Sequence, residues 1–263
     1  MDPLIITATP NISWLNPKVK FPKTPEEIAE AAEKCTKAGA SIIHIHSDGK
    51  WKDTTRLVKR RTNAIIQCGM SSLSIEDRMD AIKGDCDMLS VILGHHDESF
   101  ANVETHKLHT REELKEYATL LKRHGLKPEF EVWHSGHIWN LKYLIERNYF
   151  QSPYFSTLFF GWPGGNWSPA TLEEYLQRRR LMPDESVISV SAMGPENINV
   201  LTAAILMGDH VRVGTEDHPF IGNKQARTEE LVSWISDIAK SLGRKIASID
   251  EAVNLTGVRR RGK

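Results

Sequence analysis

The feature that most constrains the fold is an alternation, along the whole chain, of short apolar runs with longer amphipathic runs rich in charge. Short apolar runs between turn residues are typical of buried strands, and the charged runs are typical of helices. The apolar runs lie at 4–8, 41–46, 64–68, 88–93, 127–133, 154–160, 187–191 and 210–215. Roughly eight strand–helix units predict an α/β fold, a (β/α)8 TIM barrel that forms a single domain over residues 1–263. A doubly wound open sheet is the alternative, because it has the same alternation.

Composition excludes some classes of function. The 263 residues contain 34 Lys and Arg and 34 Asp and Glu, so no overall positive field indicates a nucleic-acid partner. The N-terminus lacks the pattern of a signal peptide, and no apolar run reaches the roughly 18 residues of a membrane span. Cys35, Cys68 and Cys86 are few and have no zinc-finger spacing. We therefore expect reduced cysteines and a cytoplasmic protein.

Two histidines at the end of the second predicted strand form a candidate half-site for a metal. His44 and His46 are one residue apart, and alternate residues of a strand point to the same face. Two imidazoles on one face are half of a typical metal site. The alternative is a pair of ordinary histidines, one in the core and one at the surface.

The last predicted strand supplies acidic and basic partners. Arg212 and Glu216 have the same parity, so a regular strand would point both toward the barrel axis. Glu216 is then a third ligand, and two imidazoles with one carboxylate leave zinc with open positions. Asp217 follows, where a turn could aim it at a substrate, and a buried Arg212 needs a carboxylate partner or ligand. Alternatively, Glu216 and Asp217 belong to a solvated loop.

The sequence leaves the roles of two further groups of residues open. Glu129 and Glu131 share a face of the fifth strand, where mutual repulsion would raise one pKa and suit acid–base chemistry, unless one of them is paired structurally. The segment from His134 to His137 is a competing half-site without a nearby carboxylate motif.

Four segments together resemble the β-keto acid cleavage enzyme family. They are 21–29, 38–46, 127–131 and 211–217, and the similarity extends in order over nearly the whole chain. The resemblance implies a TIM barrel with a zinc ion. It also implies transfer of the acyl part of a β-keto acid to coenzyme A, with acetyl-CoA as co-substrate and acetoacetate as product.

The resemblance also implies roles for individual residues. His44, His46 and Glu216 would bind zinc, and Asp217, oriented by Arg212, would remove a proton from the substrate. Glu129 would pair with a serine. Residues 68–72 stand where the family has its serine segment, and their sequence differs from it. The family's serine is therefore either replaced by Cys68 or displaced to Ser71 or Ser72.

The resemblance further bears on substrate and assembly. Where the aminohexanoate enzyme of this family uses a glutamate for an ammonium group, this chain has Trp14, which favours an apolar or uncharged substrate side chain over a cation–π contact. Trp162 and Trp167 would close over that side chain. Family members are commonly tetramers, which implies a homotetramer. A metal-dependent hydrolase or aldolase, and a non-catalytic metal-binding protein, are the competing hypotheses.

Overall fold

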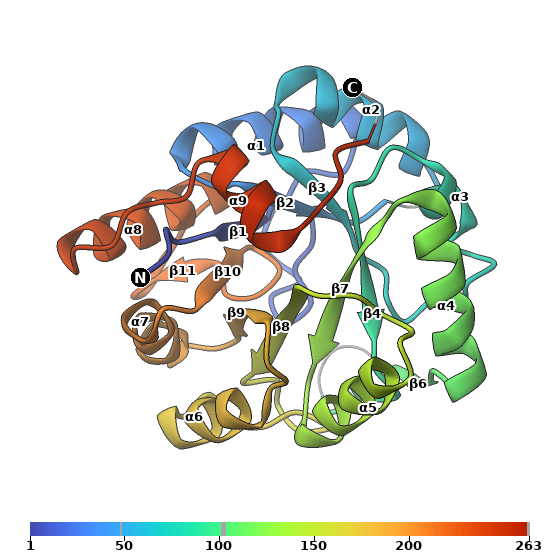
Figure 1. Ribbon diagram of the computed structural model, residues 1–263. Helices are drawn as coiled ribbons and strands as arrows, with labels where there is room; N and C mark the ends of the chain where they lie inside the picture. The colour runs from blue at the N-terminus through green and yellow to red at the C-terminus, as the bar shows by residue number, and fades with distance from the viewer. Residues whose placement is uncertain (48, 101–103, 262–263) are drawn as a thin grey trace.

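Parallel strands close into a barrel in the computed structural model, which describes residues 1–47, 49–100 and 104–261 (Figure 1). The strand order is β1-β10-β9-β8-β7-β4-β3-β2, so β1 pairs with both β10 and β2. The barrel strands are β1 (Ile6–Thr9), β2 (Ile42–Ile45), β3 (Ile65–Cys68), β4 (Met88–Ile92), β7 (Lys127–Val132), β8 (Tyr154–Phe160), β9 (Ser186–Ala192) and β10 (His210–Gly214). The predicted TIM barrel is confirmed.

Helices surround the barrel (Figure 1). They are α1 (Pro25–Ala38), α2 (Trp51–Arg61), α3 (Met79–Lys83), α4 (Arg111–His124), α5 (Ser135–Glu146), α6 (Leu172–Leu181), α7 (Asn197–Met207), α8 (Thr228–Ser241) and α9 (Ile249–Thr256). Helix α1 begins as its sequence requires, since Thr24 and Glu27 form a reciprocal capping box. Helix α3 begins only at Met79, after a turn in which Ser74 and Asp77 bond to each other.

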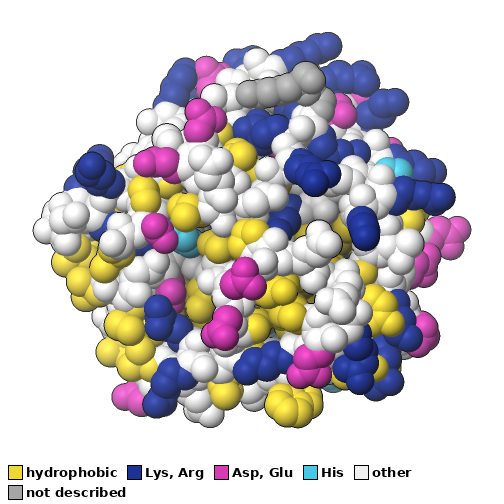
Figure 2. Space-filling view, in the orientation of Figure 1, with side chains coloured by type: hydrophobic (Ala, Val, Ile, Leu, Met, Phe, Trp, Pro, Cys, Tyr) yellow, Lys and Arg dark blue, Asp and Glu magenta, His cyan; other side chains and the backbone are white. Residues whose placement is uncertain are grey.

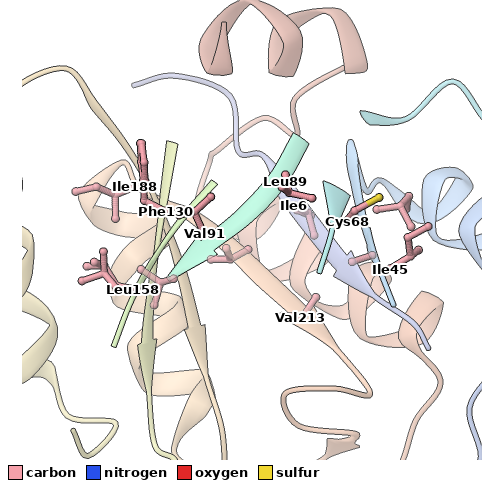
Figure 3. Close-up of a cluster of buried hydrophobic side chains, with 14 of the residues drawn as sticks. Ile6, Ile45, Cys68, Leu89, Val91, Phe130, Leu158, Ile188 and Val213 are labelled. Atoms are coloured by element: carbon pink, nitrogen blue, oxygen red, sulfur yellow. The ribbon is translucent and has the colours of Figure 1, made fainter. Parts of the chain in front are cut away.

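The strands separate two kinds of core. One face of each strand packs outward against the helices, with Ile45, Leu89 and Phe130 among the buried side chains (Figure 3). Inside the barrel, an apolar cluster fills the end where the strands begin, and Ala252 of α9 and Val258 pack against it. Helix α9 therefore covers that end of the barrel, which faces the viewer in Figure 1. On the same face, Figure 2 shows Lys and Arg side chains concentrated near the top, over α2.

Two small antiparallel hairpins lie outside the barrel sheet. A hairpin of β5 (His95–Asp97) and β6 (His106–Leu108) follows β4, and β11 (Phe220–Ile221) pairs with β12 (Lys224–Gln225) after β10. Both lie in connections that follow a barrel strand, where TIM barrels build their sites.

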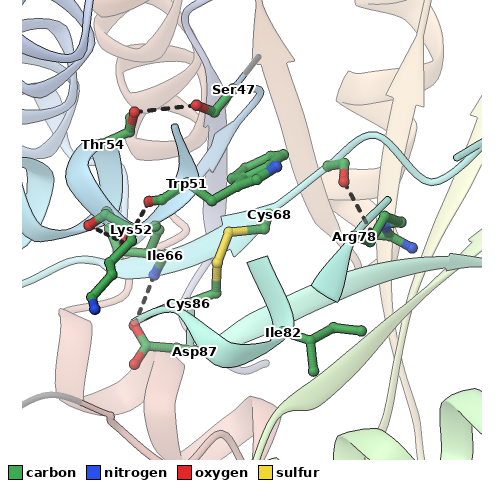
Figure 4. Close-up of a disulfide and its surroundings, with 12 residues drawn as sticks. Ser47, Trp51, Lys52, Thr54, Ile66, Cys68, Arg78, Ile82, Cys86 and Asp87 are labelled. Carbon is green, nitrogen blue, oxygen red and sulfur yellow. Dashed lines mark hydrogen bonds between the residues drawn. A yellow bond between two sulfur atoms is a disulfide. The ribbon is translucent and has the colours of Figure 1, made fainter. Parts of the chain in front are cut away.

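The cysteines differ from the expectation. Cys68 at the end of β3 and Cys86 before β4 are joined by a disulfide, and only Cys35 is free among the described residues (Figure 4). Adjacent parallel strands bring these two residues together, a proximity that spacing in sequence does not show. The prediction that the cysteines are reduced is therefore wrong for this pair.

The described residues contain no helix of the length and apolarity that a membrane crossing requires.

Candidate metal centre and active-site cavity

The three predicted ligands converge at the carboxyl ends of the strands. His44 on β2 and His46 directly after it both project inward, and their Nε2 atoms lie 3.0 Å apart. Glu216 places Oε1 3.2 Å from Nε2 of His46 and Oε2 3.6 Å from Nε2 of His44. Strand β10 ends at Gly214, so Glu216 reaches the site from the turn that follows it rather than from a regular strand.

The spacing of these donor atoms agrees with a tetrahedral metal. Ligands at about 2.0–2.1 Å from a zinc ion lie about 3.3–3.4 Å from one another at the corners of a tetrahedron. The observed separations of 3.0, 3.2 and 3.6 Å bracket that value. Burial holds the pKa of His44 well below its ordinary value, so its ring is in the neutral form that binds metals. His44, His46 and Glu216 therefore form a candidate metal site.

Gly69, after β3, leaves room for this centre. A Cβ at this position would lie 2.7 Å from Nε2 of His44 and 2.8 Å from Nε2 of His46. The backbone cannot retreat easily, since the Gly69 N–H donates to the Ile45 carbonyl at 2.9 Å and its carbonyl accepts from buried Arg78 at 3.0 Å. A side chain here would press on both imidazoles, so glycine is part of the site. Sequence analysis did not identify Gly69.

Arg212 holds the two acidic residues of the turn together. Its guanidinium donates to Asp217 Oδ1 at 3.0 Å and lies 2.8 Å from Glu216 Oε1. Burial alone would lower the pKa of Arg212, but Asp217 and then Glu216 outweigh it and raise the pKa. Burial opposes ionisation of Glu216 too, yet Arg212 and the two histidines keep its pKa well below the usual range. Burial raises the pKa of Asp217, with Arg212 opposing the shift.

The serine–glutamate pair involves a different glutamate from the one predicted. Ser71 Oγ donates to Glu131 Oε2 at 2.7 Å. Burial, and then the neighbouring Glu129, raise the pKa of Glu131 to about 8. Glu129 lies two residues earlier on β7, beside Ser90 and Thr157, and burial raises its pKa. The assignment of the serine's partner to Glu129 is corrected to Glu131, because Glu131 is one step nearer the carboxyl end of β7.

A cavity of about 100 Å³ lies beside these groups, and Asp217 and Glu129 are not among the residues that line it. The side chains that line it include His44, His46, Ser71, Glu98, Glu131, Trp133, Trp167, Arg212, Glu216 and Trp14. The Trp14 indole N–H donates to Glu216 Oε1 at 3.3 Å, so Trp14 contacts a predicted metal ligand as well as the cavity.

Two predicted site residues lie elsewhere. Cys68 is fully buried on the opposite face of β3, toward the helices, so its assignment to the site is wrong. The reason is parity, since successive residues of a strand alternate between the two faces. The ring centroids of Trp162 and Trp167 lie 5.5 Å apart in a stacked pair, and the Trp162 indole N–H donates to the Glu98 carbonyl. Of these two tryptophans, Trp167 is the one that lines the cavity.

The competing histidines serve other roles. His134 caps α5 by accepting from Gly136, and His137 is bonded to the backbone of Trp133 and His95. His96 lines the cavity while His95 is exposed, as expected for adjacent residues of a strand.

These groups define a TIM-barrel protein whose candidate metal centre lies where TIM-barrel enzymes have their active sites. Comparison with known proteins gives the family. The model of the beta-keto acid cleavage enzyme family matches residues 3–258, and the chain belongs to that family.

Characterised relatives extend over the same length. The chain is 31% identical over 288 residues to the 3-keto-5-aminohexanoate cleavage enzyme of Fusobacterium nucleatum, covering 99% of this chain and 100% of the relative. It is 26% identical over 273 residues to the 3-dehydrocarnitine:acetyl-CoA trimethylamine transferase of Rhizobium meliloti, covering 88% and 87%. The apo structure of ObcA superposes with a TM-score of 0.73 at 17% identity, over 90% of this chain and 65% of that one, which is just under two thirds. That likeness supports the barrel fold.

Proposed function

We propose that the protein is a zinc-dependent acyltransferase that converts a short β-keto acid and acetyl-CoA to acetoacetate and a new acyl-CoA. The observation that carries this proposal is the convergence of His44, His46, Glu216 and Arg212 on one cavity, with Asp217 buried behind them and bound to Arg212 at 3.0 Å. The names of the relatives, a keto acid cleavage enzyme and an acetyl-CoA transferase, support the same chemistry.

His44, His46 and Glu216 would hold the zinc ion. When bound, zinc supplies positive charge beside the substrate's ketone and carboxylate oxygens, which stabilises the enolate. Trp14 donates to Glu216 Oε1, and such a hydrogen bond to a ligand orients it.

Asp217 is the general base in this proposal. It removes a proton from the carbon between the ketone and the carboxylate, and Arg212 fixes its position with contacts of 3.0–3.2 Å. Burial raises the pKa of Asp217, which makes the carboxylate a stronger base than an exposed one. A carboxylate bound to a guanidinium is also held in one position, which lowers the entropic cost of reaching the reactive geometry.

The thioester step follows from the enolate. The enolate carbon attacks the acetyl carbonyl, and the coenzyme A thiolate leaves. The thiolate then adds to the substrate ketone, and cleavage of the carbon–carbon bond releases acetoacetate, whose carbanion takes back the proton from Asp217. Because the pKa of Glu131 is raised to about 8, its protonated carboxyl can donate to Ser71 Oγ across the 2.7 Å contact. We infer that the Ser71 O–H then donates to an oxygen of the reacting thioester.

A groove beside the cavity suits the coenzyme. It has a volume of about 470 Å³, shares His46 and Met70 with the cavity, and continues between Phe21 and Ile28 toward Lys23 and Lys50. Its apolar walls suit the pantetheine arm, and the two exposed lysines at its edge suit the phosphates. We therefore assign acetyl-CoA to this groove.

The direct test is to incubate the metal-loaded protein with acetyl-CoA and a panel of β-keto acids, and to assay acetoacetate. Acetoacetate that depends on both substrates supports the proposal. Turnover of a β-keto acid without acetyl-CoA would instead indicate a hydrolase or aldolase, and binding without turnover a non-catalytic protein. We further infer a cytoplasmic homotetramer, as the sequence resemblance implies, and light scattering would measure the assembly.

A further inference from the structure

The cavity contains a carboxylate to which the proposed mechanism gives no role. Glu98 follows β5 and lines the same cavity as the candidate metal ligands, with its side chain only 15% exposed. Its Oε2 lies 3.3 Å from Nε2 of His96. The sequence gives a weak signal for this residue, since it follows the end of a strand in an acidic pair with Asp97.

Glu98 has no cationic partner among the residues that the structure describes. Burial lowers the pKa of His96 to about 2, so this imidazole is neutral and does not balance the charge. Burial, and then repulsion from Glu216, raise the pKa of Glu98 to about 8. A buried carboxylate without a counter-charge is costly, and a cation bound beside it would offset that cost.

The backbone fixes Glu98 in place. Its N–H donates to the Thr105 carbonyl at 2.9 Å, and its own carbonyl accepts the Trp162 indole N–H at 3.2 Å. Bonds on both sides hold the residue at the cavity before any ligand arrives. Because the backbone is already ordered, only the side chain loses freedom when the carboxylate binds a partner.

Aromatic rings surround the same space. Trp133 lies with its ring centroid 3.4 Å from that of His96 and 4.6 Å from that of Trp167, and Phe159 also lines the cavity. The faces of aromatic rings attract cations, most strongly when water is excluded. A carboxylate with tryptophan walls is a combination that suits an ammonium group.

We propose that Glu98 binds a cationic group at the variable end of the β-keto acid, so that the substrate class is amino- or ammonium-substituted β-keto acids. This inference rests on the proposed function, because it assumes that the keto acid head lies at His44, His46 and Glu216 in the same cavity. It replaces the expectation of an uncharged side chain, which considered Trp14 alone. The acidic group comes from the loop after β5 instead of the segment after β1.

Binding without turnover tests this inference. The metal-loaded protein is titrated by calorimetry, without acetyl-CoA, with an ammonium-substituted 3-keto acid and with its neutral isostere that carries a methyl group instead. The wild-type protein should bind the ammonium compound more tightly. Glu98→Gln keeps the size of the side chain and should raise the Kd for the ammonium compound about 10- to 100-fold, with the Kd for the neutral compound unchanged.

Glu113→Gln is the matched control. Glu113 also lies beside a histidine, 3.4 Å from Nδ1 of His109, but on α4 and not among the residues that line the cavity. The Glu113→Gln variant should bind both compounds as the wild-type protein does.

Three results would overturn the inference. They are equal binding of both compounds by the wild-type protein, an equal loss for both in Glu98→Gln, and failure of both to bind. The proposed function fails separately. If no keto acid yields acetoacetate while selective binding persists, the acyl transfer is wrong and the cation site stands. If keto acids yield acetoacetate but the wild-type protein binds the ammonium and neutral compounds equally, the acyl transfer stands and the cation site is wrong.

Discussion

Gly69 gives the sharpest test of the metal centre, through the substitution Gly69→Ala. The added Cβ would lie 2.7 and 2.8 Å from the Nε2 atoms of His44 and His46. Ordinary van der Waals contact begins at about 3.5 Å, so the two rings must retreat by roughly 0.8 and 0.7 Å. Metal–ligand distances tolerate only about 0.2 Å. We therefore expect the affinity for Zn²⁺ to fall at least about 100-fold.

The assay separates loss of metal from loss of folding. Metal content is measured by mass spectrometry, and Zn²⁺ is titrated into the chelator-treated protein. A metal present at 100 times its Kd stabilises the wild type by about 2.7 kcal/mol, and a 100-fold weaker site reduces this to about 0.4 kcal/mol. Without metal, wild type and variant should unfold at similar temperatures, because the rings are then free to move apart.

Gly243→Ala is the control substitution. Gly243 follows α8 and has nothing within 4 Å of an added Cβ, although its φ of +79° makes alanine somewhat strained. This variant should lose some stability and keep its metal. Wild-type affinity for Zn²⁺ in Gly69→Ala would refute the reasoning, since the rings would then not need the space above Gly69.

Four further predictions concern chemistry, coenzyme binding and stability. Asp217→Asn should lower kcat about 10²- to 10⁴-fold with the metal retained, as measured by acetoacetate formation and metal content. Ser71→Ala should lower kcat about 10- to 100-fold and leave the KM for the keto acid unchanged, because the hydroxyl acts at the thioester step. Lys23→Glu combined with Lys50→Glu should raise the KM for acetyl-CoA about tenfold, but not that for the acetyl thioester of N-acetylcysteamine, which lacks phosphates. Burial lowers the pKa of His210 to about 3, so below pH 6.5 the unfolded chain binds a proton that the folded state excludes. The stability that wild type has relative to His210→Gln should therefore fall by about 1.4 kcal/mol per pH unit from pH 6 toward pH 4, as measured by urea unfolding.

Each of these predictions has an opposing result. Full activity in Asp217→Asn would remove the general base from the scheme, and an altered keto acid KM in Ser71→Ala would place that hydroxyl at the other substrate. An equal loss with both thioesters in the double lysine variant would mean that the groove does not bind the phosphates. A pH-independent difference for His210→Gln would mean that its imidazole is not held neutral.

The residues of the site show how much the sequence could predict. His44, His46 and Arg212 could be grouped in advance because strand parity and the barrel's closure are regular, and Glu216 and Asp217 could be added because they follow the end of β10. Closure of the barrel places β1 between β2 and β10. Residues from the two ends of the chain therefore lie close together.

Other features depended on contacts that no sequence pattern specifies. Glu131 rather than Glu129 meets Ser71, because Glu131 is nearer the carboxyl end of β7 and Ser71 follows the carboxyl end of β3. Cys68 pairs with Cys86 outside the barrel, and Gly69 matters only through two rings that approach it. In each case, which residues contact one another depends on a shift of one residue or of about an ångström. The alternation of side chains along a strand does not predict shifts of that size.

The sequence by itself determined the barrel, the end of the barrel that holds the site, and the residues that converge there, because these follow from periodicity and chain order. Only the tertiary structure decided which groups share the cavity with them. Glu98 reaches it from the loop after β5, and of the two tryptophans expected to close over the substrate, Trp167 lines the cavity and Trp162 does not. Loops take their conformation from the contacts they make with each other. Packing between loops therefore determines which side chains line the substrate end of the cavity, while the strands determine which residues form the candidate metal end.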